Sequence, residues 1–393
     1  MSSITEKDQK YVAGTYGRFP VELTEGKGSV LIDTDGKKYI DLTSGIGVTA
    51  FGIADEEWKK AVVAQVNKLQ HVSNLYYTEP CAVLAEKLCL LTGMKKVFFG
   101  NSGAEANECA VKVARKYAQD KKGKEYDVIV TLKNSFHGRT ITTLAATGQD
   151  VFHTKFLPLT EGFVYAEAND FASVEKAVKE NKTAGVMLEC VQGEGGVIAL
   201  NEDFIRSVAD LCKKEDVILI VDEVQTGNGR TGKPYAYMHY GIQPDVVTTA
   251  KGLGGGLPIG ACLMGEKTEN VLGKSDHGST FGGNPVACAG AITVVDRLTN
   301  DLMDEVDRKS RYVFDSLKNA EGVESVSGKG LMIGIKTTRP AKEVVDECIK
   351  QGVLCLMAKD KVRLLPALNI PFELLKEAVG IIQNVCKNTE VKA

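Results

Sequence analysis

Several features that mark other protein classes are missing from this sequence. No apolar run is long enough to span a bilayer, and the opening MSSITEKDQK has no apolar segment of the kind that a secretory signal needs. The 48 Lys and Arg residues nearly balance the 51 Asp and Glu residues, without a basic block. We therefore expect no membrane and no nucleic acid among the partners of this chain.

Paired metal ligands are missing as well. The 10 cysteines never form a C-x-x-C pair and do not lie near clustered histidines. Such isolated cysteines are typical of reduced, mostly buried thiols in a cytoplasmic protein. The expectation is a cytoplasmic protein without a metal site.

From about residue 95 the chain alternates short apolar runs with helical stretches. KVFFG, DVIVTL, AGVMLE and VILIVDE read as strands, and the segments between them as helices. This alternation predicts an α/β fold with a mostly parallel central sheet flanked by helices. In such sheets, ligands bind beyond the carboxyl ends of the strands.

The two ends of the chain differ from this middle part. A hairpin is predicted around Asp35 and Gly36, one long helix from Asn284 onward, and short strands at GLMIGIK, GVLCLM and KVRLLP. We expect both ends to form a smaller α+β domain. The predicted division is 1–45 as an N-terminal segment packing with the small domain, 46–295 as the large domain and 296–393 as the C-terminal small domain.

Two residues carry the predicted chemistry. Asp222 ends the apolar strand VILIVDE, and Lys251 lies among apolar residues and glycines in DVVTTAKGLGGGLPIGA. An isolated strand can simply end in solvated acids, and most lysines are solvated. A lysine in an apolar pocket, however, more easily provides the neutral amine that Schiff-base chemistry requires. A carboxylate beyond a strand is a suitable partner for a protonated pyridine nitrogen.

A phosphate site is predicted at FFGNSGAEANECAVKVAR, where a strand leads through Asn101 to Ala104 into a helix. Helix N-termini bind anions through their free amides. Ser102 and Glu105 also fit a capping box, and the two roles are compatible.

A nucleotide hydrolase is the main alternative from another class. GNGRTGKP fits G-x-x-x-x-G-K, and VILIVDE resembles an acidic hydrolase strand. Pro234, however, occupies the position of the metal-binding Ser or Thr, and the acidic strand precedes the glycine loop. A non-catalytic binding module is a further alternative.

The chain resembles the class III, or omega, aminotransferases of pyridoxal-phosphate fold type I. The matching segments run over nearly the whole chain in the order of the family: TYGRFPVE, GNSGAEANE, SFHGRT, ECVQGEGG, VDEVQTGNGRTG, TAKGLGGGLPIGA, HGSTFGGNP and KVRLLPALNI. The likeness is strongest to the bacterial N-acetylornithine aminotransferases. It implies the fold-type I architecture and pyridoxal 5'-phosphate as the cofactor.

The resemblance also implies roles for residues around the cofactor. Lys251 would hold it as a Schiff base, and Asp222 would pair with the ring nitrogen. The other implied contacts are Ser102 and the amides of Gly103 and Ala104 to the phosphate, Phe136 on the ring face, Glu223 and Val224 beside Asp222, Gln225 to the phenolic oxygen, and Thr280 of a partner copy to the phosphate. The active unit would be a homodimer.

Substrate contacts are implied in the same way. Arg139 would grip a carboxylate, unless it forms a structural ion pair, and Ser279 and Tyr16 would lie close by. Glu194 would mask Arg363 while an omega-amine is bound and release it for the second carboxylate of 2-oxoglutarate. Alternatively, both are charges at the rim of the site.

The implied reaction is ping-pong transamination of N2-acetyl-L-ornithine with 2-oxoglutarate in arginine biosynthesis. Ornithine, 4-aminobutyrate or succinylornithine aminotransferase and a fold-type I mutase remain alternatives. The chain departs from the family at Cys190, where proline is common, at Phe281, where tyrosine is frequent, and at FGIADEE. Because of these departures, the family pattern does not predict the shape of the substrate pocket in this chain.

Overall fold

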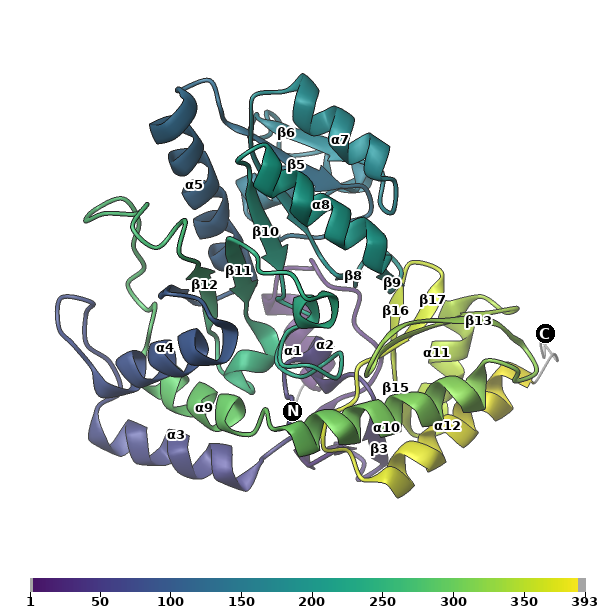
Figure 1. Ribbon diagram of the computed structural model, residues 1–393. Helices are drawn as coiled ribbons and strands as arrows, with labels where there is room; N and C mark the ends of the chain where they lie inside the picture. Colours follow the sequence, from purple (N-terminus) through teal and green to yellow (C-terminus); the bar gives the residue numbers. More distant parts are fainter. Residues whose placement is uncertain (1–2, 388–393) are drawn as a thin grey trace.

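The computed structural model describes residues 3–387. Its largest sheet has seven strands in the order β4-β12-β11-β10-β7-β5-β6 (Figure 1). All neighbouring strands are parallel except those that pair with β12, which is antiparallel to both β11 and β4. The strands are β4 (Lys96–Gly100), β5 (Val128–Leu132), β6 (Phe163–Ala166), β7 (Thr183–Leu188), β10 (Ile218–Asp222), β11 (Val246–Thr249) and β12 (Gly260–Met264).

Helices cover both faces of this sheet. In β10, Ile218 and Ile220 pack with α5 (Gly103–Lys122) on one face, whereas Leu219 and Val221 pack with α7 (Phe171–Glu180) and α8 (Glu202–Lys214) on the other. Figure 1 shows α5 on one side of the strands and α7 and α8 on the other. Because successive side chains of a strand point to opposite faces, a strand buried on both sides is apolar throughout.

A smaller α+β part is built from both ends of the chain. The N-terminal strands β1 (Leu23–Lys27), β2 (Val30–Asp33) and β3 (Lys38–Asp41) form a sheet with β15 (Val353–Leu354), which pairs with β3 in parallel. As predicted, a hairpin turn around Gly36 joins β2 to β3, and Gly36 has a φ of 80°.

A second small sheet has the order β13-β14-β17-β16, with all pairs antiparallel. Its core is shared with the helices α10, α11 and α12. The strands are β13 (Val323–Lys329), β14 (Met332–Thr337), β16 (Leu356–Ala358) and β17 (Lys361–Leu364), and the helices are α10 (Asn300–Leu317), α11 (Ala341–Lys350) and α12 (Phe372–Lys387). The predicted fold class, including a small part made from both ends, is confirmed. The boundaries after residues 45 and 295 remain a proposal.

The single long helix predicted from Asn284 is wrong. The chain forms α9 (Pro285–Asp296) and then α10, separated at Thr299, whose backbone is extended and whose side chain accepts the amide of Leu302. An N-cap of this kind starts a new helix, because its backbone does not continue the previous one.

The remaining helices lie mainly around the first hundred residues. Among residues 3–387, no helix is long and apolar enough to cross a membrane. These helices are α1 (Ile4–Tyr11), α2 (Ser44–Gly47), α3 (Glu56–Lys68), α4 (Glu79–Thr92) and α6 (Ile141–Ala146), with a short ribbon of β8 (Val191–Gln192) and β9 (Ile198–Ala199) and the 3-10 turns η1 (Asp150–Phe152), η2 (Ala236–Tyr240) and η3 (Lys251–Gly254).

Candidate active site

A cavity of about 450 Å³ lies beyond the carboxyl ends of the strands β4, β7, β10 and β11. Loops and helix starts that follow these strands supply its walls, as expected for a mostly parallel sheet. The predicted residues that line the cavity are Ser102, Gly103, Ala104, Phe136, Arg139, Asp222, Val224, Gln225 and Lys251.

Lys251 enters this cavity directly after β11. Its backbone has a φ of 44°, which is unusual for a lysine, and Nζ forms no hydrogen bond or ion pair with any residue in the range 3–387. Burial lowers the pKa of Lys251, and the nearby charge of Asp222 partly opposes this effect. The side chain is therefore an unpaired amine held in a confined site, as Schiff-base chemistry requires.

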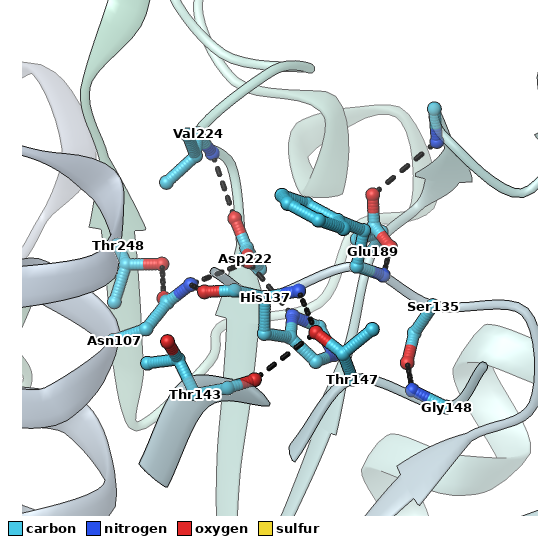
Figure 2. A network of polar contacts seen from close by, with 12 residues as sticks. Asn107, Ser135, His137, Thr143, Thr147, Gly148, Glu189, Asp222, Val224 and Thr248 are labelled. Atoms are coloured by element: carbon cyan, nitrogen blue, oxygen red, sulfur yellow. Dashed lines mark hydrogen bonds and ion pairs between the residues drawn. The ribbon is translucent and has the colours of Figure 1, made fainter. Parts of the chain in front are cut away.

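Asp222 is buried and accepts three hydrogen bonds (Figure 2). His137 Nδ1 lies 2.8 Å from Asp222 Oδ2, Asn107 Nδ2 donates to the same oxygen at 2.8 Å, and the amide of Val224 donates to Oδ1 at 2.9 Å. Thr248 Oγ1 donates to Asn107 Oδ1 at 2.6 Å and so fixes the orientation of that amide. These donors hold the carboxylate in one orientation.

His137 is fixed from its other side as well. Its backbone amide donates to Thr147 Oγ1 at 2.9 Å, and its carbonyl accepts from Asn107 at 2.7 Å. Because a carboxylate oxygen only accepts, we assign the ring proton to Nδ1. The buried Nε2 has no hydrogen-bond partner among the described residues.

Glu189 follows β7 and joins two loops of the cavity. Its Oε1 accepts the amide of Phe136 at 2.9 Å, and its Oε2 accepts the amide of Gly193 at 3.3 Å. Burial raises the pKa of Glu189 to about 7, although nearby His137 lowers it. This residue was not predicted, and neither were His137 and Asn107. Asn107 could have been found, because it lies four residues after Gly103, on the same helix face.

The start of α5 lines the cavity at the place where the sequence predicted an anion site. Ser102 Oγ accepts the amide of Glu105 at 3.2 Å, so it is an N-cap. The capping box is wrong in one detail: Glu105 accepts the backbone amide of Asn101 at 2.9 Å instead of that of Ser102. The amides of Gly103 and Ala104 belong to the first turn, where no intrahelical acceptor exists.

Close packing brings this helix start against the loop after β10. A Cβ on Gly103 would lie 2.6 Å from Val224 Cγ1, so only glycine fits here. The anion site, the buried Asp222 and the free amine of Lys251 therefore surround one cavity. This set of groups fits a phosphorylated pyridine aldehyde, with an anion site at one end and a carboxylate for the ring nitrogen.

A buried arginine and a glutamate meet beside the cavity. Arg363 Nη1 donates to Glu194 Oε1 at 2.6 Å and to Gln225 Oε1 at 3.3 Å. The side chain of Arg363 is 3% exposed and that of Glu194 is 31% exposed. Burial raises the pKa of Glu194, but Arg363 outweighs it and the net direction is down. Glu194 and Arg363 thus form an ion pair and are not two separate charges at the rim.

Arg139 presents an unpaired guanidinium at the cavity. It lies 5.5 Å from the ring centroid of Phe136 and 4.4 Å from that of Phe152, and it forms no ion pair within residues 3–387. A structural ion pair, the alternative for this residue, is therefore absent from the described part of the chain.

Besides Glu194 and Arg363, four predicted site residues do not line the cavity. The predicted place of the Glu223 side chain in the cofactor site is corrected, because its carboxylate points into the core and accepts the amide of Tyr237 at 2.8 Å. Tyr16 is 73% exposed and lines a different hollow near α1. Ser279 accepts from Asn101 Nδ2 at 3.1 Å, just behind the cavity wall, and Thr280 is exposed. The role of Thr280 in a partner copy stays a prediction.

The departures from the family pattern fall in different places. Cys190 is fully buried behind Glu189, and Phe281 is 60% exposed beside His71. All ten cysteines are free, and within residues 3–387 no three His, Cys, Asp or Glu side chains are grouped as metal ligands.

Comparison with known proteins agrees with this site. Residues 11–386 match the family model described as Aminotransferase class-III. The chain is 50% identical to the acetylornithine aminotransferase of Haemophilus ducreyi over 97% of this chain and 98% of that protein. It is 34% identical to the N-acetylornithine aminotransferase of Stenotrophomonas maltophilia, with a TM-score of 0.85 over 97% of this chain and 98% of that one.

A third similar structure is the ornithine aminotransferase of Toxoplasma gondii, at 29% identity and a TM-score of 0.93 over 97% and 94% of the two chains. The nucleotide-hydrolase alternative is wrong, and the expected enzyme class and its pyridoxal-phosphate dependence are confirmed. The chain belongs to the class III aminotransferases.

Proposed function

We propose that this chain transfers the terminal amino group of N2-acetyl-L-ornithine to 2-oxoglutarate. The products are N-acetyl-L-glutamate 5-semialdehyde and L-glutamate, as a step of arginine biosynthesis. The observation that carries this proposal is a pair of arginines: Arg139 lines the cavity without an ion pair, and Arg363, bonded to Gln225 of the cavity wall, is covered by Glu194. The names of the similar enzymes from Haemophilus ducreyi and Stenotrophomonas maltophilia support the same substrate.

Pyridoxal phosphate, when bound, withdraws electrons from the carbon that bears the amino group, so that the proton on this carbon becomes acidic. In the proposal, Asp222 faces the ring nitrogen, Gln225 faces the phenolic oxygen, and Phe136 covers a ring face. The first-turn amides of Gly103 and Ala104 hold the phosphate. The rigid set of donors around Asp222 supports its role, because a fixed carboxylate needs no reorganisation during the reaction.

Lys251 is the residue that moves the proton. Its Nζ would accept the proton from the substrate carbon and release it again within the cavity. Support comes from the free amine at the cavity and from the burial that lowers its pKa.

The two arginines explain how one cavity accepts two different substrates. N-acetylornithine has one carboxylate, which Arg139 binds while Glu194 keeps Arg363 neutralised. 2-Oxoglutarate has two, and the second displaces Glu194 from Arg363. Arg363 Nε is buried without a partner among the described residues, so this guanidinium has a donor to spare for a carboxylate.

We also propose that the active unit is a homodimer located in the cytoplasm. Large apolar side chains are exposed near the loop that carries Thr280: Leu75 is 87% exposed, Tyr76 70%, Tyr77 106% and Phe281 60%. A contiguous exposed apolar surface is typical of a subunit interface. Free thiols in all ten cysteines support a reducing compartment.

The experiment that tests the substrate is single-turnover absorbance of the holoenzyme without any keto acid. We expect N-acetylornithine to bleach the visible band faster than ornithine, 4-aminobutyrate or succinylornithine, and 2-oxoglutarate to restore it. Faster bleaching by ornithine would favour the second candidate, which the similarity to the Toxoplasma gondii enzyme suggests. A product formed without a keto acid would instead indicate a mutase.

A further inference from the structure

The segment GNGRTG, residues 227–232, is a buried connection between the two parts of the molecule. It begins just after Gln225 of the cavity, and Arg230 is only 2% exposed. A Cβ on Gly229 would lie 3.0 Å from Leu368 Cδ1, and one on Gly232 would lie 2.1 Å from Asp307 Oδ1. Gly229 and Gly232 therefore allow a close approach to the small C-terminal part.

Arg230 binds main-chain groups of that part and no carboxylate. Its Nη1 donates to the carbonyl of Leu331 at 3.1 Å and also to the carbonyl of Pro366, while its own carbonyl accepts the amide of Leu331 at 2.9 Å. None of the salt bridges within residues 3–387 includes Arg230. Burial lowers its pKa to about 10, although Asp41 opposes this, so the guanidinium stays charged at neutral pH.

The two carbonyls lie next to the ends of β17, the strand that carries Arg363, and of its neighbour β14: Leu331 directly precedes β14, and Pro366 follows β17 by two residues. In the β14–β17 ladder, Ile333 is paired with Leu364 and Gly334 with Arg363. Continuing this antiparallel register by two residues places Leu331 opposite Pro366. One nitrogen of Arg230 thus ties the start of β14 to the chain leaving β17, three residues after Arg363.

We propose that Arg230 is a positioning residue for the second carboxylate of the keto acid, acting through Arg363. Arg363 belongs to β17, whereas its partner Glu194 belongs to the large sheet's side of the molecule. The distance between these two groups depends on how β17 is held against the large part, and Arg230 is a direct polar tie across that junction. This inference rests on the proposed function of Arg363.

The test compares two acceptors that differ only in the carboxylate next to the carbonyl group. 2-Oxoglutarate carries this second carboxylate, and succinic semialdehyde has a hydrogen atom in its place. We define selectivity as the ratio of their kcat/KM values with the same amine donor. In Arg230→Gln, whose side chain cannot reach both carbonyls, we expect selectivity to fall at least fivefold, while single-turnover reaction with N-acetylornithine stays within twofold of wild type.

Conservative and surface variants separate positioning from general damage. Arg230→Lys keeps a charged donor but lacks the planar geometry, so selectivity should fall only two- to fourfold. Arg308→Met changes a guanidinium on α10 that is 59% exposed and should leave selectivity unchanged. Adding Arg230→Gln to Arg363→Gln should lower selectivity no further than Arg363→Gln alone, because both act on the same contact.

The outcomes are distinguishable. Unchanged selectivity in a folded Arg230→Gln protein, which includes equal losses with both acceptors, would overturn the inference. If Arg230→Gln does not fold, Arg230→Lys decides in its place, and unchanged selectivity there overturns it too. If wild type itself does not prefer 2-oxoglutarate, the proposed role of Arg363 fails, which is a different result.

Discussion

Lys251 carries both a buried amine and a backbone conformation that a lysine rarely adopts. Its φ of 44° lies in the left-handed region, which costs roughly 1–3 kcal/mol for such a residue. Strain of this kind persists only where the surroundings fix the backbone, and it aims the side chain of Lys251 into the cavity.

Lys251→Ala should lower kcat by about 10²–10⁴-fold or more, since this range is typical for the loss of one group that transfers a proton. The measurement is the steady-state rate with N-acetylornithine and 2-oxoglutarate. Lys233→Ala, an exposed lysine of the GNGRTGKP segment, is the matched control and should retain activity. Wild-type turnover by Lys251→Ala would contradict the assignment.

Arg139→Gln should weaken both substrates, because each presents a carboxylate to this guanidinium. A charge-assisted hydrogen bond contributes about 1.5–3 kcal/mol, so kcat/KM should fall roughly 10- to 150-fold for donor and acceptor alike. Kinetics with each substrate varied separately check this. A loss confined to one substrate would show that Arg139 serves only half of the reaction.

His239 gives a prediction about pH. Burial lowers its pKa to about 4, and its Nε2 donates to the carbonyl of Thr231 at 2.9 Å. The unfolded chain binds this proton near its ordinary pKa of about 6.5, so the contribution to stability is present above that pH and is lost as pH falls toward 4. His239→Gln should therefore show a smaller drop in Tm between pH 7 and pH 5. Parallel Tm profiles for the two proteins would refute this.

At the scale of elements, the first turn of α5 and the loop after β10 are packed so closely that one added methyl group would displace the start of the helix. Gly103→Ala places a Cβ 2.6 Å from Val224 Cγ1, so the helix start must shift and its amides move with it. We expect the Kd for pyridoxal phosphate to rise by about tenfold, an estimate equal to about 1.4 kcal/mol.

Val224→Ala provides the matched test of that clash. The double variant Gly103→Ala with Val224→Ala removes the atoms that the new methyl group meets, so cofactor affinity should recover relative to Gly103→Ala alone. Titration of the apoprotein, followed by absorbance, measures both values. No recovery would mean that the effect of Gly103→Ala is conformational and not steric.

Elements with a strong local pattern could be predicted from the sequence. The buried strands, the hairpin at Gly36 and the N-cap at Ser102 each follow from adjacent residues. The break at Thr299 could not, because the apolar pattern continues through it and only a short capping contact interrupts the helix. Glu223 was misplaced because two adjacent carboxylates at a strand end necessarily point in opposite directions.

Site residues were predictable where the family pattern marks them, and less so where only three-dimensional packing joins them. Asp222 and Lys251 line one cavity, as their positions after neighbouring strands suggest. Glu189, Asn107 and Thr248 support that cavity from elsewhere in the chain, and the bonds of Asn107 to Asp222 and Thr248 depend on how α5 lies across the sheet. The sequence gives no local sign of such long-range contacts.

At the scale of the whole molecule, the proposed dimer makes a sharp prediction for mixed subunits. Thr280→Ala and Lys251→Ala should each reduce activity. If Thr280 acts in the partner's site, a hybrid of the two variants contains one site with both defects and one with neither. Hybrids can be made by co-expression of the two impaired variants, or by mixing and refolding them. Each hybrid should then have up to half of wild-type activity.

The alternative gives the opposite result. If Thr280 acts within its own subunit, each site of the hybrid carries one defect, and mixing restores nothing. Hybrids isolated with two different affinity tags provide the measurement, and each variant carried through the same procedure alone is the control.

The order of strands in the large sheet has a consequence for how the enzyme is made. Among residues 3–387, β4 pairs with β12 alone, and β3 pairs with β15. These early strands therefore lack a partner until a much later part of the chain has been synthesised. At roughly 5–20 residues per second, the interval between β4 and β12 is on the order of ten seconds. Throughout that time the newborn chain displays an unfinished sheet edge and an open cofactor pocket. Nascent chains stalled before residue 260 should therefore bind chaperones but not pyridoxal phosphate. Once the last strands have been synthesised, chaperone binding should be lost and cofactor binding gained at the same chain length.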